Sequence, residues 1–467
     1  MKPERSWWLL ALAALAVRLW CEWCAFPFSV WNAIRLAPTF MLRFGTTPYP
    51  GLEGGPVTTW IYGPVTLLLN LPATLAGSTS LALLIAGTIN LTLAAAPAAL
   101  LCALLPAPRP GTTGADRAWA VLLCLALWPN SSLRFIQADN TAVAFGLVSN
   151  LLLLRARPDP ARPPLLAAVL LAIAVWSKQT SLGLVAAQVI WLGLSAGRAA
   201  ALRHTLACAA AGLALGGAFV AWFGWDGLWL NLVRLPGRLP FATDPLGRAA
   251  ELWPHLAGYV LIPAVAGVVF RRTLLTRNSP WLLPFLSWML LLPTGLLSVL
   301  KVGGTANSLN GILYLLPVAA LALVPALRGR WRLVAPVLAA GVLAGIALQL
   351  SLAASRPLRP VTAHLARADF LAREFPGQIY FPWNPLATFF SDRRFYHAED
   401  GLYVRYAAQL APSRALARQD FPPRWVVTAY PGESGGWGII EQLQPRNAQR
   451  QRFGEWILDS WPEPVGP

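Results

Sequence analysis

Apolar stretches of about 20 residues, the length that crosses a bilayer, recur along the first 355 residues of this chain. Short connectors that carry arginine alternate with them. The stretches lie near 7–27, 60–77, 81–104, 117–135, 139–155, 163–177, 180–196, 204–223, 256–270, 280–300, 311–327 and 333–355. This pattern predicts an all-α polytopic membrane bundle of about 11–12 hydrophobic helices.

The stretch 60–77 differs from the others because it contains Pro64 and Pro72, in "GPVTLLLNLP". Proline interrupts the hydrogen bonding of a helix interior, so a short or re-entrant helix is expected here. Full spans at both 60–77 and 81–104 would also put the next arginine-bearing connector on the wrong side of the membrane.

The pattern changes at the proline-containing turn "SRPLRP" (355–360). Beyond it, short strand-like runs such as "GQIYF" and "RWVVTAY" alternate with helical stretches such as "HLARADFLAREF". The chain is therefore expected to divide into a transmembrane domain (1–355) and a small α/β domain (356–467).

Charge is distributed unevenly between these two parts. The net charge is +17, and the first 355 residues hold 24 basic and 9 acidic groups. Under the positive-inside rule, the arginine-bearing connectors face the cytoplasm: 105–117, 155–163, 197–203, 271–277 and 328–332. The periplasmic loops are then 28–59, 224–255 and 301–310, and the C-terminal domain is periplasmic. The expected location is the inner membrane of a bacterium.

Composition excludes two other classes of protein. Only 12% of the residues are charged, about half the fraction of a soluble domain. The basic residues are scattered over short loops, which argues against a nucleic-acid-binding protein. Cys21 and Cys24 form a CxxC pair, but without a second pair they are interpreted as small apolar helix residues, not a redox or metal site.

Six of the nine carboxylates in the membrane part fall near the predicted periplasmic side, and Asp139 is the most informative of them. It stands in "RFIQADNTAVAF", where a loop enters a helix. A carboxylate so close to hydrocarbon usually lines a cavity or pathway. Capping of the helix N-terminus is the alternative.

Only three lysines occur, and two of them interrupt apolar segments. Lys178 lies in "AVWSKQTSLG" and Lys301 in "SVLKVGGTANSLNG". Either could extend to the lipid headgroups or bind an anionic lipid phosphate as a point charge. The loop 224–255 adds Arg234 and Arg238, which form either an interfacial amphipathic segment or an arginine clamp for phosphate. Pro236 makes a regular helix unexpected there.

The first loop, "WNAIRLAPTFMLRFGTTPYPGLEGGPVTTWIYGPV", resembles the region after the first helix of GT-C superfamily membrane glycosyltransferases, and of bacterial families 39 and 87 among them. "ADNTAVAF", "AVWSKQTSLG", "KVGGTANSLNG" and "YFPWNPLATFFSDRRFYHAEDGLY" are similar to later segments of these proteins. The residues that carry the likeness in the first loop are Gly45, Pro48, Tyr49, Tyr62, Gly63 and Pro64.

The resemblance implies transfer of a sugar from a polyprenyl-phosphate donor to a periplasmic or lipid acceptor, at the membrane and without a nucleotide sugar. The position of the family's usual catalytic acid corresponds to Asn32, and asparagine cannot act as a carboxylate base. Glu53 is the first candidate to replace it, with Asp139 as a second wall of the site. If neither serves, the fold has been kept and the reaction lost.

The expected mechanism is a single displacement in which Glu53 or Asp139 deprotonates the acceptor hydroxyl. Lys178, Lys301 or Arg234 would hold the leaving phosphate. A divalent cation could share that work, although no dense cluster of metal ligands is visible. The remaining candidates for substrate binding are Tyr49, Tyr62, Arg238 and Asn307.

Two other functions stay open. A transporter or lipid flippase would also place charges at the ends of proline-interrupted helices, although it should place some near the midplane. A catalytically silent scaffold would use the C-terminal domain to bind a partner. In that domain, a polar and aromatic cluster could contact an acceptor or could be ordinary packing: Trp383, Asn384, Arg393, His397 and Asp400.

Overall fold

The computed structural model describes most of the chain outside a set of gaps. The described ranges are 30–105, 111–127, 136–156, 165–244, 281–327, 359–413, 425–427, 449–453 and 456–460, with a few isolated residues between them. The predicted apolar stretches 256–270 and 333–355, most of 7–27, and the Cys21–Cys24 pair lie outside the described residues.

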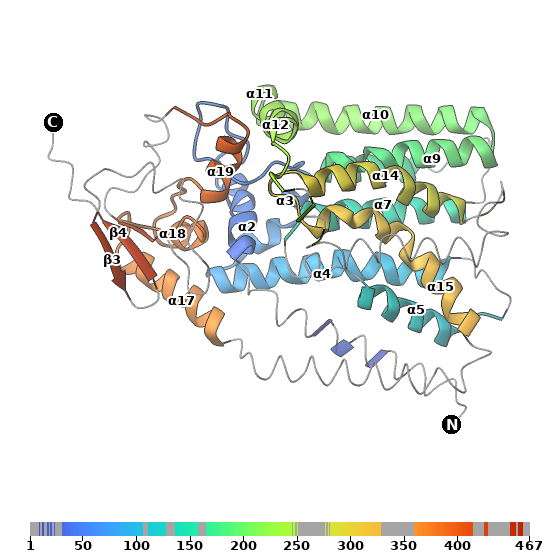
Figure 1. The fold of residues 1–467 in the computed structure, drawn as a ribbon, viewed down its shortest axis with the longest axis horizontal. Coiled ribbons are helices and arrows are strands. Elements are labelled where there is room, and N and C mark those ends of the chain that lie inside the picture. Colours follow the sequence, from blue (N-terminus) through green and yellow to red (C-terminus); the bar gives the residue numbers. More distant parts are fainter. Residues whose placement is uncertain are drawn as a thin grey trace. The chain divides into compact units, whose positions relative to one another are not determined.

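The chain forms two compact units (Figure 1). The first, here called the helical unit, comprises Met1–Ala25, Asn90–Ala218 and Phe241–Pro357. The second, here called the mixed unit, comprises Phe26–Ile89, Phe219–Pro240 and Leu358–Pro467. The first predicted loop and part of 224–255 therefore belong to the same unit as the C-terminal segment.

The described part of the helical unit is built from the predicted apolar stretches. Its helices are α5 (Gly114–Leu127), α7 (Ala138–Arg155), α8 (Leu165–Ser177), α9 (Leu182–Ser195), α14 (Leu282–Leu300) and α15 (Leu316–Leu327), with the short helices η3 (Gln179–Ser181) and η5 (Ala306–Tyr314). Two longer helices, α4 (Thr79–Leu104) and α10 (Arg198–Phe223), run from one unit into the other. Helix α14 packs against α9 (Figure 1) and against η5, and α8 packs against α7.

Three helices among the described residues are long and apolar enough to cross a membrane: α4, α10 and α14. The pair η5 and α15, bent by 55°, would make a fourth if it is one broken span. The apolar helices α8 and α9 are shorter. The polytopic character is thus supported, and the count of 11–12 helices stays a prediction.

Small residues and a buried polar network hold the helical unit together. A Cβ at Gly146 of α7 would lie 2.3 Å from the Tyr314 hydroxyl, so only glycine allows this approach. Gln188 of α9 donates to Ser149 Oγ and Asn150 Oδ1 of α7, each at 2.8 Å, and His204 Nε2 of α10 lies 2.7 Å from Gln188 Oε1. Small residues and interhelical hydrogen bonds are the usual means of helix association in lipid.

The helices within the stretch 60–77 are short, as its two prolines predict. Pro64 precedes α3 (Val65–Leu69), and Pro72 lies in the first turn of η2 (Leu71–Leu75). Neither helix is long enough to cross a bilayer.

The segment after α10 is helical but irregular. It runs as α11 (Trp225–Trp229), a π-turn η4 (Leu230–Arg234) and α12 (Leu235–Arg238). Pro236 is accommodated because it falls in the first turn of α12, where its missing N–H is not needed. The irregularity expected at this proline therefore appears as a π-turn.

The mixed unit combines helices with a small sheet. Helix α2 (Val30–Arg43) packs on α18 (Pro385–Asp392), where the Phe40 and Phe389 rings lie 5.3 Å apart. Helix α17 (Arg359–Glu374) packs on α18 and on strand β1 (Ile379–Tyr380), and α19 (Glu399–Ala407) follows. The strands form one sheet in the order β1-β2-β4-β3, with β2 at Trp425–Val427, β3 at Gln449–Phe453 and β4 at Trp456–Ser460.

Strand pairing in this sheet is mixed. β1 pairs with β2 in parallel, whereas β4 pairs antiparallel with both β2 and β3. The runs "GQIYF" and "RWVVTAY" contain β1 and β2, and "HLARADFLAREF" lies in α17 except for its last residue, so these three predictions of secondary structure are confirmed. The periplasmic position of the segment stays a prediction.

Candidate active site

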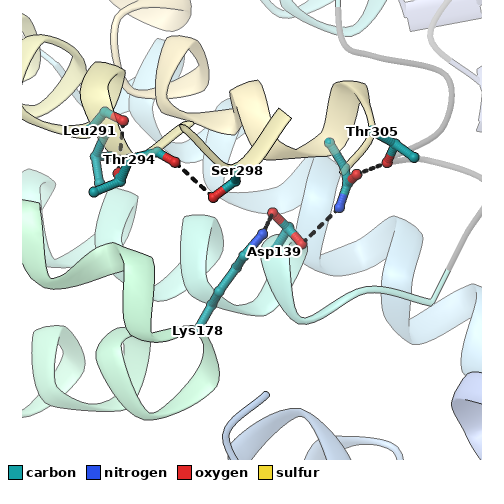
Figure 2. Close-up of polar contacts among 7 residues, drawn as sticks. Asp139, Lys178, Leu291, Thr294, Ser298 and Thr305 are labelled. Atoms are coloured by element: carbon teal, nitrogen blue, oxygen red, sulfur yellow. Dashed lines mark hydrogen bonds and ion pairs between the residues drawn. The ribbon is translucent and has the colours of Figure 1, made fainter. Parts of the chain in front are cut away.

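The site begins with Asp139 in the first turn of α7, preceded by the extended residue Gln137. Lys178 lies between α8 and η3. Both side chains are buried, and Lys178 Nζ donates a hydrogen bond to Asp139 Oδ1 (Figure 2). The helix N-terminus adds a partial positive charge near the carboxylate. Two residues that are 39 positions apart in the sequence thus form a buried ion pair.

A third segment completes the arrangement around the carboxylate. Asn307 Nδ2 in η5 donates to Asp139 Oδ2 at 3.2 Å, and the Thr305 hydroxyl donates to Asn307 Oδ1. Because Thr305 occupies the carbonyl side of the Asn307 amide, the NH₂ side faces Asp139. Both oxygens of Asp139 therefore accept a hydrogen bond from a side chain of another segment. These contacts favour an ion-pair role for Asp139 over simple helix capping.

A small polar cavity of about 30 Å³ adjoins the ion pair. Hydroxyl and amide side chains contribute to its wall: Thr180, Ser181, Thr294, Ser308, Asn310 and Tyr314. Polar space of this size holds about two water molecules. Among the described residues that line it, Asp139 and Lys178 are the only charged ones. The arrangement offers a carboxylate for proton transfer and an ammonium group for an anion in a largely apolar bundle.

Of the predicted site residues, the structure brings Asp139, Lys178 and Asn307 together. Lys301 lies at the C-terminus of α14, half-buried, and forms an antiparallel bridge with Phe241. It does not line the cavity.

Four predicted residues belong to the first loop region of the mixed unit. Asn32 is fully buried in α2, and Glu53 is exposed, with its Oε2 accepting a long hydrogen bond of 3.4 Å from Ser413 N. Tyr49 is buried, and its hydroxyl donates to the Tyr62 carbonyl oxygen at 2.8 Å. Burial raises the pKa of Tyr49. The Tyr49 side chain therefore links the two ends of the loop segment 49–62.

Arg234 and Arg238 occupy the ends of η4 and α12, and both side chains are exposed. Their neighbour Leu235 is buried. An exposed pair with a buried leucine between them fits an amphipathic segment, and a role in phosphate binding stays a prediction.

Members of the predicted C-terminal cluster have partners in their own unit. Trp383 stacks edge-on against Trp31 at 5.3 Å, and the Arg393 guanidinium lies 4.9 Å from the Phe389 ring centre. His397 Nδ1 accepts a hydrogen bond of 2.9 Å from Val57 N. Burial raises the pKa of Asp400 to about 7, although Arg35 counteracts the shift. These contacts favour packing over acceptor binding.

Sequence reasoning missed Arg405 and Asn231. Arg405 is 1% exposed, and its guanidinium donates to the carbonyl oxygens of Pro50, Gly51 and Leu52 at 2.9–3.1 Å. Asn231 Nδ2 donates to the Pro50 oxygen at 3.1 Å. Nothing in "GLYVRYAAQL" distinguishes Arg405 from a surface arginine, because its partners are backbone atoms about 350 residues away.

No metal site emerges from the described residues. Within them, no three His, Cys, Asp or Glu side chains lie close enough to hold a metal ion. The divalent cation considered from the sequence therefore has no residues assigned to it.

The sequence matches no protein-family model and no curated protein. The fold is similar to the crystal structure of ArnT from Cupriavidus metallidurans bound to undecaprenyl phosphate, with a TM-score of 0.52 and 12% sequence identity. The match covers 96% of this chain and 97% of that chain. ArnT is a GT-C glycosyltransferase.

This chain has a GT-C-like fold. The resemblance seen in the first-loop motifs is thereby confirmed at the level of the fold, and the chain is a membrane protein by architecture. An identity of 12% supports the fold alone, so the narrower likeness to families 39 and 87 stays a prediction.

Proposed function

We propose that this protein is a membrane glycosyltransferase that moves a sugar from a polyprenyl-phosphate donor to an acceptor, with the Asp139–Lys178 cavity as its reaction site. The observation that carries the proposal is the buried ion pair beside a polar cavity in a GT-C-like fold. The similar ArnT structure contains undecaprenyl phosphate, which supports a polyprenyl-phosphate lipid as partner. The proposed setting is a bacterial inner membrane, with the C-terminal segment in the periplasm.

Lys178 is the proposed contact for the donor phosphate. Its ammonium group has three donors and a flexible stem, so it can turn from Asp139 to a phosphate oxygen without a change in the backbone. An anion beside Asp139 would be repelled unless Lys178 compensates its charge. Lys178 would also stabilise the charge that develops on the leaving phosphate.

Asp139 is the proposed general base. A carboxylate oxygen that lies in a polar cavity can accept the proton of an acceptor hydroxyl. When Lys178 turns to the phosphate, Asp139 Oδ1 becomes available to the acceptor hydroxyl. The acceptor hydroxyl gives its proton to Asp139, and its oxygen bonds to the anomeric carbon. At the same time the bond between the anomeric carbon and the phosphate oxygen breaks, and polyprenyl phosphate leaves with the electron pair.

Glu53 is the second candidate for the base. It is exposed on a loop of the mixed unit, where an acceptor could reach it without opening a buried pair. Lys301, Arg234 and Arg238 remain proposed contacts for phosphate or lipid headgroups, and Tyr49 and Tyr62 remain proposed parts of the substrate-binding loop.

The test is sugar transfer by the purified protein in liposomes, with a panel of radiolabelled polyprenyl-phosphate sugars. Loss of the base should lower kcat by about 10²–10⁴-fold, so Asp139→Asn is expected to be nearly inactive. Lys178→Met should weaken donor binding, and Lys178→Arg should recover part of it. Asp226→Asn, at an exposed site on α11, is the matched control.

The outcomes separate the candidates. Full activity in Asp139→Asn together with inactivity in Glu53→Gln would move the base to Glu53. Donor binding without turnover by the unaltered protein would favour a silent GT-C-like scaffold. No donor binding at all would contradict the proposal.

Lipid flipping is the second candidate function, because a buried ion pair beside a cavity is also a feature of transport pathways. The same liposomes distinguish the two functions. A flippase would move the intact lipid between leaflets, and the sugar–phosphate bond would survive.

A further inference from the structure

The described part of the first loop is anchored by one buried arginine. Arg405 lies in the last turn of α19. Its Nη2 donates to the Pro50 oxygen at 2.9 Å, and its Nη1 donates to Gly51 at 2.9 Å and Leu52 at 3.1 Å. Burying a cation costs free energy unless hydrogen bonds replace those it made to water. Moving the three carbonyl groups away from Arg405 would therefore leave a buried charge without partners, which disfavours any such movement.

A second segment, α11 and η4, also contacts this turn. Asn231 in η4 donates from one amide nitrogen to the Pro50 oxygen at 3.1 Å and to the Gly227 oxygen at 2.7 Å. The backbone of α11 approaches so closely that a Cβ at Gly227 would lie 2.3 Å from the Tyr49 oxygen. Two carbonyl groups of the turn are therefore in contact with the segment that follows α10.

The start of α19 holds the loop a few residues further on. His397 Nδ1 accepts from Val57 N at 2.9 Å, and Ala398 N donates to the Val57 oxygen at 2.9 Å. A Cβ at Gly401 would lie 2.5 Å from the Thr58 oxygen. The helix α19 thus fixes the loop both before and after the interval that contains Glu53.

Burial lowers the pKa of Arg405 to about 10, and the nearby charge of Glu53 counteracts this shift. The Glu53 carboxylate also accepts from Ser413 N, just beyond α19. Leu52, beside it, packs with Ile61 against Leu230, Leu235 and Leu410. Backbone and side-chain contacts therefore converge on this one acidic residue of the loop.

We propose that Arg405 is a positioning residue, which fixes the turn Pro50–Leu52 and thereby sets the position of the Glu53 carboxylate. The part of this inference that concerns sugar transfer rests on the proposed function with its second candidate, Glu53, as the base. The part that concerns the loop does not. In this view the C-terminal segment contributes to the reaction by fixing a loop that lies about 350 residues earlier in the chain.

The loop is tested by amide hydrogen exchange in Arg405→Lys. A lysine keeps the charge, but its single ammonium group cannot reproduce the fork that reaches three carbonyl oxygens. Exchange of peptides covering 49–54 should become at least 10-fold faster, whereas peptides from α7 should be unchanged. Asn231→Ala, which removes the other contact to Pro50, should give a smaller acceleration. Arg373→Lys, at an exposed position of α17, is the control.

The reaction is tested by a double-mutant cycle between Arg405→Lys and Glu53→Gln. If Arg405 acts through Glu53, Arg405→Lys lowers kcat about 10-fold with little change in KM, and adding it to Glu53→Gln lowers kcat no further. Multiplied losses in the double variant would overturn the positioning role, because they indicate independent effects.

Failure of the two proposals can be told apart. Unchanged exchange of 49–54 in both Arg405→Lys and Asn231→Ala would overturn the loop inference, whatever the activity. Faster exchange in a protein that transfers no sugar from any donor would keep the role of Arg405 in the loop and contradict the proposed function instead.

Discussion

The helical unit and the mixed unit use buried charge in opposite ways. In the helical unit, Lys178 and Asp139 neutralise each other beside a polar cavity. In the mixed unit, Arg405 makes no hydrogen bond to a carboxylate among the described residues. Its guanidinium donates instead to three backbone carbonyl groups. The first arrangement can exchange partners when an anion arrives. The second has no such partner to release, so it serves to fix a loop.

This difference teaches which buried charges are candidates for chemistry. A lysine paired with an aspartate has an alternative state of similar electrostatic balance, in which the lysine binds a phosphate and the carboxylate accepts a proton. An arginine that holds backbone carbonyl groups has no equivalent alternative. Changes to the first should act on catalysis and stability together, and changes to the second should act mainly through loop order.

The largest effect on stability is expected at the ion pair. Lys178→Met leaves an uncompensated buried carboxylate, which should lower the free energy of unfolding by about 3–5 kcal/mol. The double variant Asp139→Asn with Lys178→Met should recover part of that loss, because neither partner is then a lone charge. Thermal unfolding of the purified protein in detergent measures both. A double variant that is less stable than Lys178→Met would contradict the pairing.

The mixed unit should show a pH dependence through Asp400. Its carboxyl is buried, which raises its pKa from 3.8 to about 7, while Arg35 opposes the shift and Glu399 adds to it. Between these values the folded state binds more protons than the unfolded state, so stability falls as the pH rises and levels off above about 7. The full difference corresponds to at most about 4 kcal/mol.

Asp400→Asn is the variant that isolates this effect. It should flatten the pH profile of unfolding between pH 4 and 7 and stabilise the protein at pH 8. Asp244→Asn, at an exposed position, should leave the profile unchanged. A profile that keeps its slope in Asp400→Asn would assign the dependence to another group.

Sequence reasoning succeeded where charge is scarce. Asp139 and Lys178 stand out because they interrupt apolar stretches, so both could be singled out from the sequence. Their pairing could not be, because the two positions are 39 residues apart and the geometry of α7 and α8 decides which side chains meet. Asn307 was found through family resemblance, and its contact with Asp139 depends on the conformation of η5.

The same reasoning failed where charge is ordinary. The C-terminal segment has the charge density of a soluble domain, so one arginine in α19 attracts no attention. Its partners are backbone oxygens, and backbone atoms carry no sequence signal. Apolar periodicity gave the helices and the short strands β1 and β2, because those depend on local pattern. The anchoring of the first loop by α19 depends on long-range packing, which that pattern does not encode.

A smaller effect is expected where α19 contacts the loop through a glycine. In Gly401→Ala the new Cβ would meet the Thr58 carbonyl at 2.5 Å, so the backbone must shift, at a cost of about 1–3 kcal/mol. Gly237 in α12 has open space around the same position. Gly237→Ala should therefore be neutral or slightly stabilising. Equal effects of the two substitutions on thermal unfolding would contradict the close approach at Gly401.

The smallest effect concerns the contact between α17 and the start of α4. Thr79 donates to Asp369 from its hydroxyl at 2.6 Å and from its backbone N–H at 3.2 Å, and burial raises the pKa of Asp369. Thr79→Val keeps the shape and the backbone bond but removes the hydroxyl, which should cost about 1.5 kcal/mol. Thr88→Val, on the same helix, removes an exposed hydroxyl that donates to the Leu84 carbonyl oxygen in its own helix, so its cost should be near zero. Because Asp369 accepts both bonds, Thr79→Val in an Asp369→Asn background should cost less than in the unaltered protein, and an undiminished cost there would show that the hydroxyl acts through another group.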